Sequence, residues 1–500
     1  MDQVGLTARA RRHWLFGLVL VAALVLRILV ALAFRPIMWF GGDSASYLAT
    51  GLRLIPDPAR VGGYGFMLWV LRPLHSFALV AAVQHLMGLA MGVLIYLLAR
   101  RYGLPAWAAT LATVPVLFDA YDLQLESDAL PDVPFAFLVV LALYLLLRSP
   151  GERRPAPTMA AAFLLGVSAL LWPVGLVLLG VLLAVLLIAL LIRRAGLVTV
   201  LAALLAGALP VAAYGAWFSI HRHQFSLTRS DGVYLWSRTM SFADCAVIRL
   251  PAAERPLCPP PGPRIAASLY IWNANSPVLA MPTGRFSART NHLALHFALR
   301  AIAAQPGDYA AAVAHDFGLS FFWDRPVHPD AAIVNRYQFA DATTAWVPPT
   351  LWTPGGGTLA GDQAVYNTGR PAPTRAVQPY ASWLVTYQRY VYLRGTLLGV
   401  ILLAGLAGMV IRRRVSGPGL PWAFAVTILL VPPLVADFDL RYLVPAVPVA
   451  CLAAALAFAP GAGQRKWTTS PAATATSEPE DTRTSSLPSE STPATGPESA

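Results

Sequence analysis

One acid, one tyrosine and one arginine follow the first apolar run of the chain at short intervals. Asp43 comes directly after two glycines, Tyr47 follows it, and Arg53 lies near the end of the stretch 40–54. A carboxylate at the edge of a membrane is costly unless it faces water, a partner or a substrate. Asp43 is therefore either a solvated loop acid or a general base, which accepts the proton of a reacting hydroxyl group. On this stretch alone the solvated acid is the simpler interpretation.

A second group of acids lies where the fourth apolar run begins. It consists of Glu126, Asp128 and Asp132, within the stretch 119–132. An acid near a helix N-terminus is favoured by the helix dipole, and this effect explains one of the three. Three such acids close together, on the side of the membrane where Asp43 is expected, favour a functional site.

The composition defines the class of protein. Of the 500 residues, 57% are hydrophobic and 12% charged, and the mean hydropathy is +0.57. A helix needs about 20 apolar residues to cross a membrane, and several runs reach that length. The net charge of +12 comes from short arginine clusters between these runs, which is typical of a topology signal and not of a nucleic-acid surface. Lys466 is the only lysine, so a Gly-x-x-x-x-Gly-Lys phosphate loop is excluded.

The apolar runs predict an all-α polytopic membrane protein with about ten transmembrane helices. If the helices cross alternately, every cluster of two or three arginines falls on one side, which the positive-inside rule makes the cytoplasm. Both termini are then cytoplasmic, and the protein is expected in the plasma membrane. The expected helices cover 15–33, 77–99, 105–118, a run that ends before Arg148, a hairpin within 159–192 that turns at Trp172-Pro173, 197–218, 391–411, 421–435 and 443–458.

Shifts in composition divide the chain into four parts. An N-terminal transmembrane bundle covers 1–218 and includes the first external loop at 35–74. The segment 219–390 is rich in Pro, Trp and Tyr and is expected to be an extracytoplasmic domain, partly helical and partly irregular. C-terminal transmembrane helices occupy 391–460, and the Ser-, Thr-, Pro- and Glu-rich tail at 461–500 is expected to be disordered in the cytoplasm.

Two of the three cysteines lie in the expected external domain. Because the exterior of a cell is oxidising, a disulfide between Cys245 and Cys258 is favoured over two free thiols. Cys451 lies in the last apolar run and is expected to be a small core residue.

Three motifs in this order resemble those of the GT-C class of integral-membrane glycosyltransferases. More narrowly, the chain resembles the bacterial members of the phospholipid-carrier-dependent, protein-mannosyltransferase-like family. The motifs are the acid of the first external loop in 42–47, the acidic turn 126–132 and the Arg-Tyr-Leu-Val-Pro entry at 441–445. The resemblance covers about residues 10–460.

The chain departs from that pattern at two places. Family members often carry two adjacent acids in the first loop, where this chain has Asp43 alone. Many also carry Arg-Pro in the turn between the fifth and sixth helices, where this chain has Trp172-Pro173. Either change could alter donor specificity or abolish activity.

The resemblance implies transfer of a sugar from a polyprenyl-phosphate donor to a cell-envelope acceptor, which could be a glycan, a lipid or a protein. The reaction would occur at the outer face of the membrane and invert the anomeric carbon. Phosphate is a good leaving group, so the site needs a carboxylate base and cations for the departing phosphate more than a strong acid. Mannose and arabinose donors both fit this chemistry.

Residue roles follow from the resemblance and from this chemistry. Asp43 is expected to be the base and Arg441 a contact of the phosphate. Arg53, Arg60 and Arg72 are possible substitutes for Arg441. Glu126 and Asp132 would bind sugar or acceptor hydroxyls, or hold a divalent metal. The lipid bilayer and the two substrates are the expected partners, with no nucleic acid. The full expected substrate-binding set is Glu126, Asp128, Asp132, Tyr47, Arg53, Arg441 and Tyr442.

Two rival classes stay open. A transporter or lipid flippase would also have many helices, but its charged residues are expected near the membrane midplane on broken helices. A non-catalytic envelope-assembly protein would bind a partner through its external domain. If the chain is an enzyme, Asp43, Glu126 and Arg441 should line one outward-facing cavity.

Overall fold

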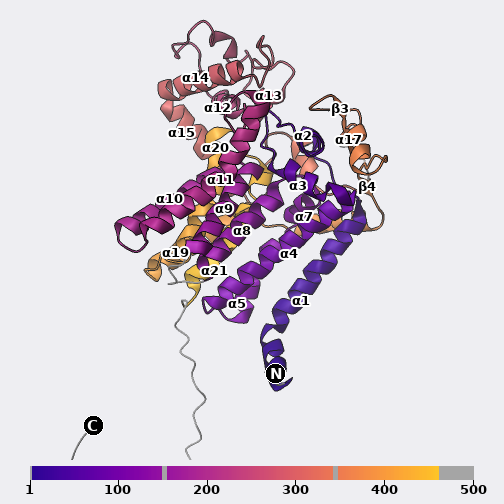
Figure 1. Ribbon diagram of the computed structural model, residues 1–500, viewed down its shortest axis with the longest axis vertical. Helices are drawn as coiled ribbons and strands as arrows, with labels where there is room; N and C mark the ends of the chain where they lie inside the picture. The colour runs from indigo at the N-terminus through magenta and orange to yellow at the C-terminus, as the bar shows by residue number, and fades with distance from the viewer. Residues whose placement is uncertain (1–2, 149–154, 342–346, 461–500) are drawn as a thin grey trace, which may run out of the picture. The chain divides into compact units, whose positions relative to one another are not determined.

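The computed structural model of the protein describes residues 3–148, 155–341 and 347–460. Helices dominate this part of the chain, and the described residues belong to one compact unit (Figure 1). The tail predicted to be disordered, 461–500, lies outside the described residues. The protein is therefore an all-α membrane protein, as its composition predicts.

In the part of the chain that the structure describes, five helices are long and apolar enough to cross a membrane. A bent pair of helices adds a sixth span if the pair is counted as one. The bend in that pair, between α18 and α19, is 54°. The five are α1 (Gln3–Ala33), α4 (Phe77–Arg101), α10 (Val174–Leu191), α11 (Leu197–Arg222) and α21 (Ala446–Phe458) with the turn η4 (Leu440–Tyr442) before it, and the bent pair is α18 (Tyr380–Tyr390) and α19 (Gly395–Ile411).

Four further apolar segments are helical but shorter than a full crossing. Each of them also coincides with a run that the sequence predicts to be a transmembrane helix. They are α5 (Ala106–Leu111) with α6 (Val114–Phe118), α8 (Asp132–Leu147), α9 (Pro155–Leu171) and α20 (Gly419–Val435).

The long apolar run around 159–192 is broken at the position that the sequence predicts. Helix α9 ends at Leu171, Pro173 precedes α10, and the two helices pack against each other. A methyl group on Gly175 would lie 2.4 Å from the backbone nitrogen of Ala169, so the turn depends on a glycine at this point.

Shorter elements follow the first span and fill the segment after α11. In Figure 1, α12, α13, α14 and α15 gather at one end of the bundle of long helices. The helices are α2 (Gly41–Arg53), α3 (Gly63–Leu71), η1 (Arg72–Leu74), α7 (Ala120–Ser127), α12 (Asp231–Thr239), η2 (Arg255–Leu257), α13 (Ala267–Trp272), α14 (Ala288–Ala304), α15 (Pro306–Leu319), α16 (Ala331–Val334), η3 (Asn335–Tyr337) and α17 (Leu359–Tyr366). The strands form two antiparallel pairs, β1 (Phe34–Arg35) with β4 (Arg375–Ala376) and β2 (Trp352–Thr353) with β3 (Gly357–Thr358).

The helices α12, α13 and α14 enclose a hydrophobic core of their own. Trp236 and Phe297 are fully buried in it. Cys245 and Cys258 form a disulfide at its edge, with 6.2 Å between their Cα atoms, which is the pairing that the sequence favours. Cys451 is buried in α21.

Backbone hydrogen bonds join the two acidic stretches that the sequence singles out. The N–H of Met38, in the first loop, donates to the carbonyl of Ser127 at 2.7 Å, and the N–H of Ala129 donates to the carbonyl of Met38 at 2.9 Å. This short ladder fixes the position of α2, which carries Asp43, against the turn between α7 and α8. The fold therefore brings the first two motifs together by main-chain contacts.

Candidate active site

Asp43 lies in the first turn of α2, and two arginines hold its carboxylate. Arg60 places Nη2 at 2.6 Å and Nε at 2.7 Å from Oδ1. Arg441, from the turn before α21, donates from Nη1 to Oδ2 at 2.9 Å. The side chain of Asp43 keeps 18% of its surface exposed, so the group is reachable from outside. The structure thus joins the first and last of the three motifs through one carboxylate.

The two guanidinium groups decide the protonation state of Asp43. Burial alone would raise the pKa of this carboxyl, but the charges and hydrogen bonds of Arg60 and Arg441 outweigh burial and hold the pKa below its ordinary value. Asp43 is therefore ionised at neutral pH.

Arg60 owes its position to a tight turn around Asp57. The buried Asp57 carboxylate accepts the N–H of Ala59 at 2.6 Å and the N–H of Arg60 at 3.2 Å, while Ser46 of α2 donates to its other oxygen at 2.5 Å. The guanidinium of Arg60 also lies 4.9 Å from the ring centre of Trp272, at the end of α13. The segment after α11 therefore contacts the site directly.

Arg441 is placed by the η4 turn and by two aromatic rings. Asp439 caps that turn, because its Oδ1 accepts the N–H of Arg441 at 3.2 Å. The guanidinium lies 5.5 Å from the ring centre of Phe40 and 5.4 Å from that of Tyr442. Its Nε points toward Asp132 Oδ1, at 3.9 Å. Arg441 thus lies between acids from both acidic motifs.

Two buried polar atoms of this cluster have unused hydrogen-bonding capacity among the described residues. Among the described residues, neither Nε of Arg441 nor Oδ2 of Asp132 has a hydrogen-bond partner, although both atoms are buried. Buried polar atoms are nearly always satisfied, so each of these atoms is available to a water molecule or to a ligand group. Nε of Arg441 can donate to a phosphate oxygen, and Oδ2 of Asp132 can accept from a hydroxyl group.

Tyr47 and Asp128 lie beside the cluster. Tyr47 follows Asp43 by one turn of α2, and its ring meets that of Tyr64 edge-on at 5.4 Å. Burial raises the pKa of Tyr47, and the charge of Asp43 raises it further, so the phenol stays neutral. Gln124 donates to Asp128 at 2.7 Å, and burial raises the pKa of Asp128 well above its ordinary value.

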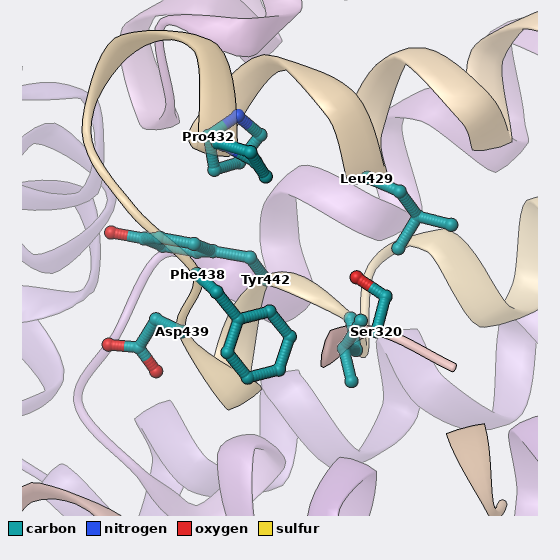
Figure 2. Close-up of a pocket in the computed structure, with 8 residues that line it drawn as sticks. Ser320, Leu429, Pro432, Phe438, Asp439 and Tyr442 are labelled. Atoms are coloured by element: carbon teal, nitrogen blue, oxygen red, sulfur yellow. The ribbon is translucent and has the colours of Figure 1, made fainter. Parts of the chain in front are cut away.

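Tyr442 connects the site to Trp172-Pro173, the second of the two departures from the family pattern. Its ring stacks on Trp172 at 5.0 Å between centres. Tyr442 also lines a cavity of about 10 Å³ with Pro432, Phe438 and Asp439 (Figure 2). That volume holds about one water molecule.

Glu126 belongs to a different cluster. It is fully buried, with Oε1 at 2.6 Å from Nη2 of Arg27 and Oε2 at 2.7 Å from Nδ1 of His85. An arginine within a membrane span needs a partner, and Glu126 supplies it. The carboxylate of Glu126 therefore faces α1 and α4 rather than Arg441.

Arg53 likewise has a partner away from Asp43. Its two terminal nitrogens lie 2.9 and 2.5 Å from the two oxygens of Asp362, in α17. The glycine run 355–357 surrounds this pair, since a methyl group on Gly357 would lie 2.3 Å from Nη2 of Arg53. The glycine run thus leaves room for an ion pair.

The acids of the site do not fit a divalent cation. In the part of the chain that the structure describes, no three His, Cys, Asp or Glu side chains converge as a metal site. Arg441 lies against both Asp43 and Asp132, and its positive charge opposes a cation between them. We therefore derive no step through a metal.

Residues 73–226 match the family model of the dolichyl-phosphate-mannose-protein mannosyltransferases. This match confirms the resemblance to protein-mannosyltransferase-like glycosyltransferases over the segment that carries the acidic turn 126–132. No curated protein sequence matches the chain.

Solved structures of glycosyltransferases are among those similar to the chain. They include the Saccharomyces cerevisiae Pmt1–Pmt2 complex bound to the sugar donor, with 16% identity and a TM-score of 0.33 over 46% of this chain and 36% of that one. ArnT from Cupriavidus metallidurans bound to undecaprenyl phosphate has 14% identity and a TM-score of 0.35, over 89% and 77%. AglB from Archaeoglobus fulgidus in complex with an inhibitory peptide and a dolichol-phosphate has 14% identity and a TM-score of 0.37, over 90% and 50%. The chain thus spans about a third of the first protein's length and half of the third, and TM-scores this low carry no argument about function.

Proposed function

We propose that the protein transfers a sugar from a polyprenyl-phosphate donor to a cell-envelope acceptor at the outer face of the plasma membrane, with both termini in the cytoplasm. The observation that carries the proposal is the ion-paired Asp43, held between Arg60 and Arg441 and partly exposed. The family match over 73–226 supports the class of donor, because lipid-phosphate mannose is the donor in that family's description.

The chemistry follows from the charges around Asp43. The acceptor hydroxyl attacks the anomeric carbon on the face opposite the phosphate, so the new bond forms with inversion. The bond between the anomeric carbon and the phosphate oxygen breaks, and its electron pair leaves with the phosphate. Asp43 takes the proton of the acceptor hydroxyl. Each atom and charge is accounted for without a cofactor.

Arg441 is the group best placed to receive the departing phosphate. One of its nitrogens contacts Asp43, while its Nε is free of hydrogen bonds among the described residues. A guanidinium has several donors in a planar fork, so it can contact a carboxylate and a phosphate together. Arg60 contributes a second positive charge on the same side.

Asp132 is the group that we assign to hydroxyl recognition. Its Oδ2 is buried and open, and it lies next to Arg441. A hydroxyl of the sugar or of the acceptor can donate to this oxygen. The sugar itself, mannose or a pentose such as arabinose, is a question for experiment.

The test uses the purified full-length protein in liposomes with mannosyl- and arabinosyl-phosphoryl polyprenol. Asp43→Asn should lower the rate of transfer by a factor of about 10²–10⁴, because the amide cannot accept the proton. Asp324→Asn is the matched control, since Asp324 is 82% exposed in its pair with Arg394. If Asp43→Asn transfers sugar at the wild-type rate, Asp43 is not the base. If the wild type moves the lipid across the bilayer and transfers no sugar, the protein is a flippase.

A further inference from the structure

Arg441 is part of a closed ring of contacts that includes three residues outside the three motifs, namely Asp439, Tyr337 and Phe40. Asp439 accepts the N–H of Arg441 with Oδ1 and the hydroxyl of Tyr337 with Oδ2, at 3.2 and 2.9 Å. The ring of Tyr337 stacks on Phe40 at 5.0 Å between centres. Phe40 in turn lies under the guanidinium of Arg441. The contacts therefore run from Asp439 through Tyr337 and Phe40 to the side chain of Arg441 and back along its backbone.

This ring joins three segments that are far apart in the sequence. Asp439 and Arg441 belong to the turn before α21, and Tyr337 belongs to η3 in the segment after α11. Phe40 directly precedes α2, and its N–H donates to Ser44 at 2.8 Å. A shift of any one segment would displace the guanidinium from Asp43.

We infer that Asp439 is a positioning residue, which holds Arg441 against Asp43 through its own hydrogen bonds to the Arg441 backbone and to Tyr337. The inference rests on the proposed function, in which Arg441 binds the donor phosphate. Asp439 does not touch the substrate in this scheme and acts only through Arg441 and Tyr337.

Both hydrogen bonds of Asp439 require an acceptor, which the ionised carboxylate provides on each oxygen. The protonated acid carries a hydrogen on one oxygen, so it loses one of the two acceptor positions. Donor binding should therefore weaken where Asp439 takes up a proton.

The surroundings of Asp439 bring that proton uptake into the physiological range. Burial raises the pKa of Asp439 to about 7, although the positive charge of Arg441 and the Tyr337 hydrogen bond oppose the rise. Asp437 adds a negative charge that raises the pKa further. The other groups that face this position are Tyr442, in the same turn, and His328, which lies 3.6 Å from Asp437.

His328 is a second titratable group near Asp439, and its effect must be separated from that of Asp439. Burial lowers the pKa of His328, but Asp437 outweighs burial and raises the pKa above its ordinary value. His328 contacts Asp437 and has no contact with the Arg441 backbone among the described residues. Replacement of His328 should therefore move the pH at which donor binding weakens, but donor binding should still depend on pH.

The experiment measures KM for the donor and kcat of the purified enzyme between pH 5.5 and 8.5, a range set by the pKa of about 7. In the wild type, KM for the donor should rise as the pH falls through about 7. Asp439→Asn keeps the cap on the Arg441 N–H but loses the charge, so KM should rise about tenfold and lose this pH dependence. Tyr337→Phe keeps the ring on Phe40 and removes the hydroxyl, so KM should rise in the same direction.

Three results would overturn the inference. The first is an unchanged KM and an unchanged pH dependence in Asp439→Asn. The second is loss of the pH dependence in His328→Gln, which would assign it to His328. The third is a KM for the donor in Tyr337→Phe that equals the wild-type value. This variant also tests the inference if Asp439→Asn does not fold. Absence of sugar transfer by the wild type would contradict the proposed function instead, so the two failures are distinguishable.

Discussion

Arg27 and Glu126 form a buried ion pair between the first membrane span and the turn that carries the acidic motif. Nη2 of Arg27 lies 2.6 Å from Oε1 of Glu126, and Nη1 of Arg27 donates to the carbonyl of Leu117 at 3.0 Å. His85 of α4 occupies the second oxygen of Glu126. The ion pair thus connects α1, α4, α6 and α7.

Removal of Glu126 should destabilise the protein more than it impairs chemistry. Glu126→Ala leaves Arg27 buried without its partner, which costs about 3–5 kcal/mol in comparable pairs. The melting temperature in detergent should fall strongly, and the double variant Arg27→Met with Glu126→Ala should recover part of the loss. The opposite pattern, lost transfer with an unchanged melting temperature, would assign Glu126 to substrate binding as the family motif suggests.

A substitution at Gly88 of α4 can disturb this ion pair while both charged residues are kept. A methyl group at Gly88 would lie 1.7 Å from Oε1 of Glu126 and 2.9 Å from Nη2 of Arg27. Gly88→Ala should therefore lower the melting temperature, despite the higher helix propensity of alanine. Gly180→Ala is the matched control, because no atom lies within 4 Å of the added methyl group in α10. Equal melting temperatures for the two variants would contradict the close packing.

Much of the site can be predicted from the sequence, because its residues lie near helix ends that are expected on the same side of the membrane. The arginine clusters predict which ends of the helices face outward, and this places Asp43, Asp132 and Arg441 at one membrane face. The turn at Trp172-Pro173 follows in the same way from the limit that membrane thickness sets on helix length. The contact between Arg441 of the last motif and Asp43 of the first is consistent with the prediction that both lie at the same membrane face.

Other parts of the site depend on pairings that have no local signal. Glu126 and Asp128 are neighbours in the sequence, yet the end of α7 turns one toward Arg27 and the other toward Gln124. Arg27 was the available clue, since a single arginine within a span requires an acidic partner. The contact between Tyr337 and Asp439 joins residues 102 positions apart, and no short motif predicts it.

Replacement of Arg60 should change the pH dependence of transfer in a defined direction. Arg60 is one of two positive charges that lower the pKa of Asp43, so Arg60→Gln should raise that pKa. A base with a higher pKa becomes protonated at a higher pH, and the acidic limit of activity should therefore move upward in the variant. The measurement is the pH profile of kcat with saturating donor and acceptor.

Arg72→Gln is a suitable control for the Arg60 experiment. Arg72 lies in η1, where its Nη1 donates to the carbonyl of Leu52 at 3.4 Å. Its loss removes the same charge from the same loop without changing the partners of Asp43. An identical shift in both variants would mean that the total charge of the loop, and not the Arg60–Asp43 pair, sets the profile.

Trp272 offers a test of whether the segment 219–390 takes part in acceptor binding, as we propose from its contact with Arg60. Its ring packs on the guanidinium groups of Arg60 and Arg285, at 4.9 and 5.3 Å, and 41% of the side chain is exposed. An exposed aromatic face next to the reacting carboxylate can pack on a sugar ring. Trp272→Ala should therefore raise KM for the acceptor more than KM for the donor.

Two further variants make the Trp272 result specific. Trp272→Phe keeps an aromatic face over Arg60 and should retain most of the acceptor affinity. Trp383→Ala removes a tryptophan of α18 that is 54% exposed and should leave both KM values unchanged. A uniform fall in kcat for Trp272→Ala with both KM values unchanged would mean that the ring only holds Arg60 in place. In that case the segment 219–390 stabilises the arrangement around Asp43, and Asp132 is the next residue to test for acceptor binding.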